Sequence, residues 1–492
     1  MARQEKKIVA GPQKDGKIEG RIRWKRRSIS YDKRKQRNQY SSPDSRRILE
    51  GLAKEIWEHP ESGFKEKIAC EKTAKVLEDA GFSVETGAGG VPTAIRAEWG
   101  SGHPVIGFLG EYDALPGLSQ KVSSRKEPVM EGACGHGCGH NLLGAAAVGG
   151  AIGMKAELEE KGLPGTVVFY GCPGEELLCG KSFMAREGCF SELDLALTWH
   201  PASINQANIS LMSACSSVKF YYTGVTSHAA NDPWNGRSAL DAVQLLNMAA
   251  EFMREHVSPQ VRLHYAILNG GGAPNIVPDK SGVWYYVRAL DRKVVEEVYN
   301  RLVKAAEGAA MMTETQLEGE YMGGCYPMVG NEVLAGVMKE TMEEVGQEPW
   351  TEEEIQWARA MNEPVEMQRQ NVVKRLKLDP DTQLFTGIAP MQGGVIYAST
   401  DVGDVAHIVP TAMPNFAAAS LGAPGHSWQI TSASGGSIGL KGMIYAAKTL
   451  AAAGVRLAKD PDLRAKAKAE FDEMMNGETY VCPIPKDMKL PQ

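Results

Sequence analysis

The sequence lacks a long hydrophobic run, a disulfide framework and an internal repeat. Its longest weakly polar stretch, Leu142 to Met154, is interrupted by glycines and is too short to span a bilayer. No hydrophobic segment opens the chain, as a secretory signal would require. The nine cysteines are odd in number and scattered, which is typical of a reducing compartment. We therefore expect a cytoplasmic protein that does not span a membrane.

Charge is unevenly distributed along the 492 residues. The formal net charge is −6, yet residues 1–40 carry fourteen Lys or Arg and four Asp or Glu. With almost no apolar periodicity, residues 1–44 are predicted to form a basic, disordered tail. A nucleic-acid-binding arm is the alternative interpretation, which would require steeply salt-dependent binding. Nucleic acid is not our expected partner.

Buried strands alternate with helices in the first half of the chain. Apolar runs at 105–109, 166–170 and 193–198 are too continuous for half-exposed strands. A helix is predicted over 141–161, with Asn141 as its N-cap. This alternation is typical of a doubly wound α/β fold, in which ligands bind beyond the carboxyl ends of the strands. A length of 492 residues also favours more than one domain.

The pattern changes near residue 212, where strands and helices follow the order β-α-β-β-α-β of a ferredoxin-like domain. Because βα material resumes afterwards, we expect an α+β domain inserted into the α/β domain. The predicted divisions are a tail (1–44), the first part of the catalytic domain (45–211), the inserted lid or dimerisation domain (212–328), the second catalytic part (329–475) and a C-terminal tail (476–492).

Residues 132–141 concentrate two cysteines and two histidines between glycines, immediately before the helix predicted at 141. Thiolate and imidazole bind borderline-soft divalent metals, and glycine lets a backbone turn tightly around an ion. A closed structural zinc site or an ordinary glycine-rich turn would also fit this loop alone. Other residues further along the chain decide between these interpretations.

Acidic and histidine residues follow the later strands and could join the loop in a two-metal site. A thiolate can bridge two cations while other side chains fill the outer positions. The predicted ligands are Cys138, His140, Glu176, His200 and His426. Consecutive side chains at a strand end point to opposite sides, so Glu176 can bind metal while Glu175 faces the water. We assign Glu175 as general base and then general acid.

The motifs together resemble the M20 metallopeptidases, in particular an amidohydrolase branch whose loop reads His-x-Cys-Gly-His-Asp. Here the loop is residues 136–141, ending in Asn141, and further similarity extends over about residues 45–487. The resemblance implies a zinc-peptidase-like catalytic domain with an inserted lid that dimerises. It also implies two divalent ions, Zn²⁺ or Mn²⁺, and hydrolysis of an amide N-terminal to a carboxylate-bearing amino acid.

The resemblance also suggests roles for residues outside the ligand set. His228 matches a lid histidine that reaches a partner's active site, and Asp113 matches a residue behind the metal ligands. Asn275 and Arg288 match lid positions expected to bind the substrate carboxylate or the oxyanion, although an ordinary salt bridge would equally suit Arg288.

Several functions are compatible with that site. The resemblance favours N-acyl or N-aroyl amino acids, with p-aminobenzoyl-glutamate foremost, and a homodimer or a heteromer with a related chain. An aminoacylase or dipeptidase acting on another acyl group is the first alternative. The second is a partner subunit of a heteromeric hydrolase with little activity alone.

Overall fold

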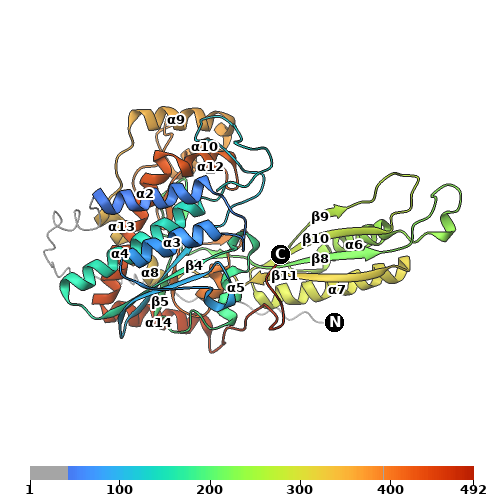
Figure 1. Ribbon diagram of the computed structural model, residues 1–492, viewed down its shortest axis with the longest axis horizontal. Helices are drawn as coiled ribbons and strands as arrows, with labels where there is room; N and C mark the ends of the chain where they lie inside the picture. Colours follow the sequence, from blue (N-terminus) through green and yellow to red (C-terminus); the bar gives the residue numbers. More distant parts are fainter. Residues whose placement is uncertain (1–42, 392, 492) are drawn as a thin grey trace, which may run out of the picture.

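The computed structural model describes residues 43–391 and 393–491, which form a rounded body and a long arm projecting from it (Figure 1). The tail predicted for residues 1–44, and with it the nucleic-acid-binding arm, lies outside the described residues except for Pro43 and Asp44. Those two residues begin helix α2 (Pro43–Glu58). Among the described residues, no helix is both long and apolar enough to cross a membrane.

The body is built on a six-stranded mixed sheet. Its order is β1-β2-β4-β3-β5-β13, with β3, β4, β5 and β13 parallel and β1 and β2 antiparallel. The strands are β1 (Ser83–Thr86), β2 (Ile95–Ser101), β3 (Val105–Glu111), β4 (Gly165–Cys172), β5 (Leu195–Leu197) and β13 (Thr411–Ala412). The parallel centre confirms the α/β class.

Both faces of this sheet are buried, which explains the continuous apolar runs. Along β4, Val167 and Phe169 enter one hydrophobic core, whereas Val168 and Tyr170 enter another on the opposite face. Helices over the first core are α2, α3 (Lys67–Asp79), α4 (His140–Lys161), α8 (Glu332–Val345) and α13 (Ser437–Lys459); α5 (Gly180–Arg186) and α11 (Val402–Ala406) pack against the second.

The arm is a four-stranded antiparallel sheet with two helices on one face (Figure 1). Its order, β11-β8-β10-β9, is that of the predicted ferredoxin-like fold. We call this region the lid. Its elements are β8 (Ala214–Thr223), α6 (Ala239–Met253), β9 (Arg262–Asn269), β10 (Lys280–Ala289), α7 (Arg292–Thr313) and β11 (Gln316–Cys325). Its core is separate from the two cores of the body.

The remaining elements lie around the body. A segment at 346–390 contains α9 (Glu352–Asn362), which starts with a capping box of Thr351 and Glu354, and α10 (Glu366–Leu376). Only 415–417 of the apolar run 415–421 forms a strand, and it pairs with β6 rather than the main sheet. The short strands are β6 (His200–Ala202), β7 (Leu211–Met212), β12 (Val395–Ile396) and β14 (Asn415–Ala417); the last helices are α12 (Trp428–Gly435) and α14 (Pro461–Met475).

Residues 476–492 were predicted as a tail, but the described part packs against the body. Ile484 is buried in the second core, and the Tyr480 hydroxyl donates to Asp404 Oδ1 at 2.6 Å. Arg186 donates to the carbonyls of Pro485 and Met488. The segment therefore covers α5 and α11.

Candidate metal centre

The glycine-rich loop approaches its neighbours too closely to carry larger side chains. A Cβ at Gly135 would lie 2.0 Å from the carbonyl oxygen of Leu118, and Gly139 has a φ of 81° directly before α4. The N-cap prediction is wrong, because α4 begins at His140 with Gly139 as N-cap. Asn141 lies inside the helix, and its buried amide donates to the carbonyls of Ala53 and Ser434 instead.

A first group of ligand atoms comes from the loop and from the end of β5. Cys138, His140 and His200 each offer an atom within 4.8 Å of the others. The Cys138 Sγ lies 3.3 Å from His200 Nε2. Since β5 ends just before His200, this group lies at the carboxyl end of the sheet, where α/β folds bind ligands.

A second group shares the same thiol. Cys138, Glu176 and His426 also offer atoms within 4.8 Å of one another, and His426 Nε2 lies 3.5 Å from Glu176 Oε2. His426 precedes α12 and adopts a φ of 53°, so its backbone is in the left-handed region. All five predicted ligands therefore meet, and the thiol of Cys138 belongs to both groups.

Hydrogen bonds aim the histidine nitrogens at the centre of the site. The Nδ1 of His140 lies 2.9 Å from Asp113 Oδ1, and the Nδ1 of His200 lies 2.8 Å from the Pro201 carbonyl. With Nδ1 as donor, the Nε2 of each ring keeps its lone pair for a cation. The other oxygen of Asp113 accepts from the Glu176 backbone N–H at 2.9 Å.

Two buried atoms of the site have no hydrogen-bond partner among the described residues: His140 Nε2 and Glu176 Oε1. Buried polar atoms are normally paired, so two of them facing one place are what a bound cation would satisfy. Together with a thiol, a second carboxylate oxygen and two further imidazoles, they form a donor set that fits Zn²⁺ or Mn²⁺. The residues therefore fit divalent metal.

Burial dominates the electrostatics of the metal-free site. It raises the pKa of Glu176 to about 7 and that of the Cys138 thiol to about 12. Burial lowers the pKa of His200. Burial opposes a charged His140, but Cys138 and Asp113 outweigh it and raise its pKa well above the ordinary value. Binding a cation reverses the cost of a charged thiolate and carboxylate.

Glu175 and Glu176 point to different sides of the centre. Glu175 Oε2 lies 3.8 Å from His140 Nε2, whereas Glu176 faces His426. Both residues lie in a single 3₁₀ turn after β4, preceded by Gly174 at a φ of 68°. Burial, and then the nearby carboxylate of Glu111, raises the pKa of Glu175 well above its usual value.

Sequence reasoning missed a buried ionic group beside the site. Lys181 Nζ donates to Glu111 Oε1 at 2.6 Å and to Asp401 Oδ1 at 2.5 Å. A Glu at the end of β3, in line with the other strand ends, was the only available signal for Glu111. Nothing in the pattern around Lys181 or Asp401 indicated that they would meet.

The structure separates the three predicted lid residues. His228 and Asn275 follow the outer ends of β8 and β9, where the Ala229 N–H donates to the Asn275 carbonyl at 2.9 Å. Arg288 pairs with Cys215 at the inner end and donates to Ser399 Oγ at 2.6 Å. Ten strand residues span about 30 Å, so His228 and Asn275 are remote from Cys138 within one chain.

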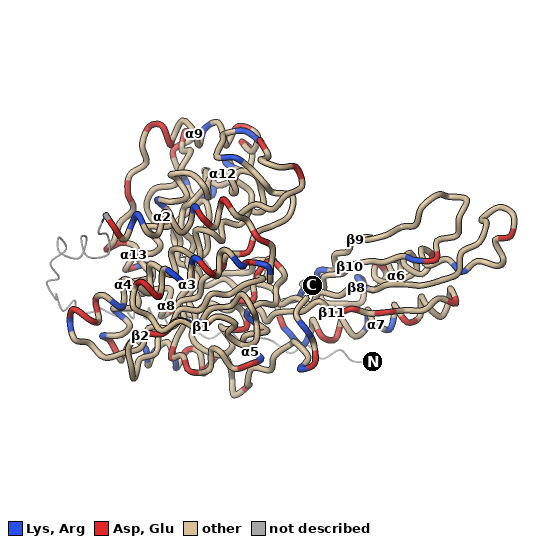
Figure 2. Tube along the Cα trace, in the orientation of Figure 1, with Lys and Arg blue, Asp and Glu red and all other residues tan. Residues whose placement is uncertain are grey.

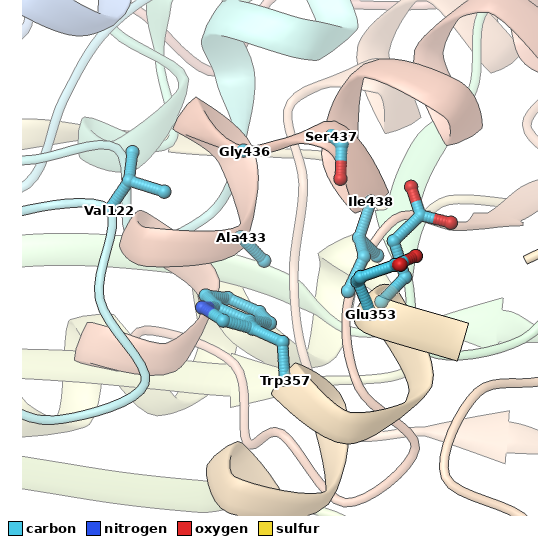
Figure 3. A pocket seen from close by; sticks show the side chains of 8 residues that line it. Val122, Glu353, Trp357, Ala433, Gly436, Ser437 and Ile438 are labelled. Carbon is cyan, nitrogen blue, oxygen red and sulfur yellow. The ribbon is translucent and has the colours of Figure 1, made fainter. Parts of the chain in front are cut away.

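A cavity of about 250 Å³ lies elsewhere, where α9 meets α12 and the start of α13 (Figure 3). Trp357, Val122 and Ile438 line it, together with the acidic side chains of Glu353 and Glu354. None of its lining residues belongs to either ligand group. This cavity is therefore distinct from the metal centre.

The fold and site define a metal-dependent hydrolase: an α/β body with clustered ligands at its strand ends and an α+β lid. Residues 215–311, within the lid, match a peptidase dimerisation domain. The chain is 41% identical to one of the two subunits of p-aminobenzoyl-glutamate hydrolase from Escherichia coli, over 89% of this chain and 94% of that protein. The chain belongs to the M20 family of metallopeptidases and amidohydrolases.

More distant relatives agree with this assignment. The Xaa-Arg dipeptidase of Mus musculus is 29% identical, over 86% of this chain and 88% of its own. Among solved structures, an aminobenzoyl-glutamate utilization protein from Klebsiella pneumoniae has a TM-score of 0.57 at 16% identity, covering 84% of this chain and 97% of that one. A dinuclear metal-binding M20 peptidase from Bacillus subtilis has a TM-score of 0.52 at 15% identity, covering 85% and 99%. These structures support the fold.

Proposed function

We propose that this protein is a dinuclear metal-dependent amidohydrolase that cleaves N-acyl or N-aroyl amino acids, with p-aminobenzoyl-glutamate as the favoured substrate. The observation that carries the proposal is the thiol of Cys138, which belongs to two separate groups of ligand atoms. A shared thiolate is a suitable bridge between two cations. The choice of substrate follows the relative that is 41% identical over nearly its full length.

In this proposal one cation binds Cys138, His140 and His200, and the other binds Cys138, Glu176 and His426. Asp113 supports His140 from behind through the Nδ1 contact. Bound Zn²⁺ or Mn²⁺ would polarise the scissile carbonyl and acidify a water molecule. The protein's own contribution is to hold the donors rigidly at the end of a buried sheet.

Glu175 is the proposed general base and then general acid. Its carboxyl group is buried beside His140 without belonging to either of the two groups that share Cys138. A raised pKa suits a group that must accept a proton from water and then donate it to the leaving amine. Glu175 therefore would move the proton while Glu176 binds metal.

His228 and Asn275 are proposed to act on the active site of a second copy. Both residues are exposed at the outer end of the lid, remote from their own metal centre. His228 Nδ1 accepts hydrogen bonds from the N–H groups of Ala230 and Asn231, which leaves Nε2 directed away from that turn. Arg288 lies at the inner end, where its charge contributes to lowering the pKa of His426 after burial and His140. It would bind the substrate carboxylate within its own chain.

The proposed contact between copies is the edge strand β9 with the outer face of α6. Tyr265, Ile267 and Leu268 are 39–44% exposed on β9, and beyond Arg262 the strand carries no charge (Figure 2). Met248 and Phe252 are exposed one turn apart on α6. An uncharged edge with exposed apolar side chains is a pairing surface for another strand. Pairing two lids would bring their outer ends toward the opposite bodies.

The test is metal analysis of the purified chain followed by hydrolysis assays with Mn²⁺ and Zn²⁺. We expect two divalent ions per chain and release of p-aminobenzoate from p-aminobenzoyl-glutamate. A panel of N-acyl amino acids measures the acyl preference through kcat/KM. A chain that binds no metal under these conditions, or hydrolyses none of the amides, would contradict the proposal.

A dipeptidase is the second candidate, supported by 29% identity to Xaa-Arg dipeptidases of mouse and human. Adding Xaa-Arg dipeptides to the panel decides between the two substrates. The other subunit of the Escherichia coli hydrolase also matches, at 26% identity over 45% of this chain and 52% of its own. Activity that appears only after such a related chain is added would indicate a heteromeric enzyme.

A further inference from the structure

Lys181 is fully buried between two carboxylates. Its Nζ contacts Glu111 and Asp401 at 2.6 and 2.5 Å, and its backbone N–H donates to Asp401 Oδ2 at 2.8 Å. Taking a lysine out of water is costly unless it is well paired, and this pairing uses two acids for one base. The trio therefore buries a surplus negative charge.

That surplus faces the metal centre. Glu111 binds Lys181 with one oxygen, while its other oxygen, Oε2, lies 3.4 Å from His140 Nε2. That Nε2 is buried and has no hydrogen bond among the described residues. Glu111, His140 and Glu175 offer atoms within 4.8 Å of one another, a third group that could hold a cation.

We propose that Glu111 is a further ligand side chain of the metal centre, on its His140 side, and that Lys181 positions it. Asp401 holds Lys181 from the other side through both its ammonium and its backbone N–H. The inference rests on the proposed two-metal function, since it adds a carboxylate oxygen to the donors of one cation. Oxygen ligation at this position also favours Mn²⁺ over a purely Cys/His environment.

Asp404 shows what a purely structural buried carboxylate looks like in the same region. It is fully buried on α11, and both of its oxygens have protein donors: the Tyr480 hydroxyl and the Tyr326 N–H, at 2.6 and 3.1 Å. Glu111 instead offers one oxygen to an imidazole nitrogen that already has a metal-ligating role. The two carboxylates therefore form a matched pair for experiment.

The experiment measures Mn²⁺ binding to the full-length chain, stripped of metal by chelation, with calorimetry and elemental analysis. Wild type should bind two ions. Glu111→Gln keeps the shape of the side chain, and we expect about 10- to 100-fold weaker binding at one of the two sites. Lys181→Met should weaken the same site, because it releases the carboxylate. Asp404→Asn should bind both ions with wild-type affinity.

Thermal unfolding of each variant separates lost ligation from lost structure. If Glu111→Gln does not fold, Glu111→Asp carries the test, because it keeps the charge beside Lys181 but withdraws it from His140 by one methylene. Two ions bound with wild-type affinity by the folded glutamine variant, or by this aspartate variant in its place, would overturn the inference and leave the proposed function intact. A wild type that binds fewer than two ions would instead contradict the proposed function.

Discussion

The body and the outer end of the lid present their functional residues in opposite ways. In the body, the side chains of Cys138, His140 and Glu176 are held among buried neighbours and converge from different strand ends. At the outer end of the lid, His228 and Asn275 are exposed and are remote from the metal ligands of their own chain. The first region is complete within one chain, whereas the second acquires a role only beside another molecule.

This difference teaches where to look for each kind of function. A preorganised metal centre needs ligands that are fixed by packing and by bonds to outer residues, as Asp113 fixes His140. A residue donated to a partner needs the reverse, because it must be accessible before the partner arrives. Burial therefore identifies the first kind of residue, and exposure at the end of a dimerisation domain identifies the second.

The largest effect is expected from Cys138→Ala, which removes the one atom common to both ligand groups. We predict loss of both metals and a fall of activity to background, because neither group keeps three donors. Elemental analysis and the hydrolysis assay measure the two losses. Cys134→Ala, in the same loop but outside both groups, should keep metal and activity. One tightly retained ion in Cys138→Ala would show that the sites are independent.

Glu175→Ala should lower kcat by about 10²- to 10⁴-fold, the range for loss of a general acid–base group. Metal content should stay near wild type, since Glu175 lies outside the two groups that share the thiol. Comparison with Glu176→Ala, which should lose metal from one group, tests the division between these neighbours. Full turnover by the Glu175 variant would remove it as the base.

His228→Ala tests whether the lid acts across the dimer. Alone, it should lower kcat with little change in metal content, because His228 is far from the ligands of its own chain. Co-expressed with Glu175→Ala, it should regain activity, since a mixed dimer has one site with both groups intact. Random pairing of equal amounts predicts about a quarter of wild-type activity. No recovery in verified mixed dimers would place His228 outside the partner's site.

Asn362→Ala tests the 346–390 segment as a support for His426. The Asn362 side chain accepts from the Gly422 N–H and donates to Gln383, whose carbonyl accepts from Leu421. Removing this buried amide should cost about 1–3 kcal/mol of unfolding free energy. Hydrogen exchange should increase over 421–427, and metal affinity should fall severalfold. The exposed Gln370→Ala on the same segment serves as control.

A smaller effect is expected from Glu66→Gln, through pH. Glu66 accepts from Thr93 and from the Gly174 N–H, and burial raises its pKa to about 8. The unfolded chain ionises this group near its ordinary pKa, so the folded form binds the extra proton between about pH 4.5 and 8. Wild-type stability should therefore decline as pH rises through this range, by on the order of a few kcal/mol. Denaturation at several pH values should show a flatter profile for the variant, and an unchanged profile would contradict the assignment.

Periodicity and motif order were sufficient to predict much of the fold. Apolar runs at 105–109 and 166–170 predicted buried strands because both of their faces pack against helices. The run at 415–421 misled for a related reason: it is buried among loops rather than within the main sheet. Periodicity records burial but not the pairing partner. Asn141 was assigned to a cap because its residue type favours caps, while tertiary packing placed it inside the helix.

Residue chemistry by itself determined which side chains could ligate metal, because thiol, imidazole and carboxylate near strand ends have few other reasons to recur. Only the tertiary structure decided that the thiol of Cys138 belongs to two groups, that Lys181 draws Glu111 beside His140, and that His228 lies beyond reach of its own centre. The physical reason is that ligand type is a local property. Distance between side chains depends on how the whole chain packs.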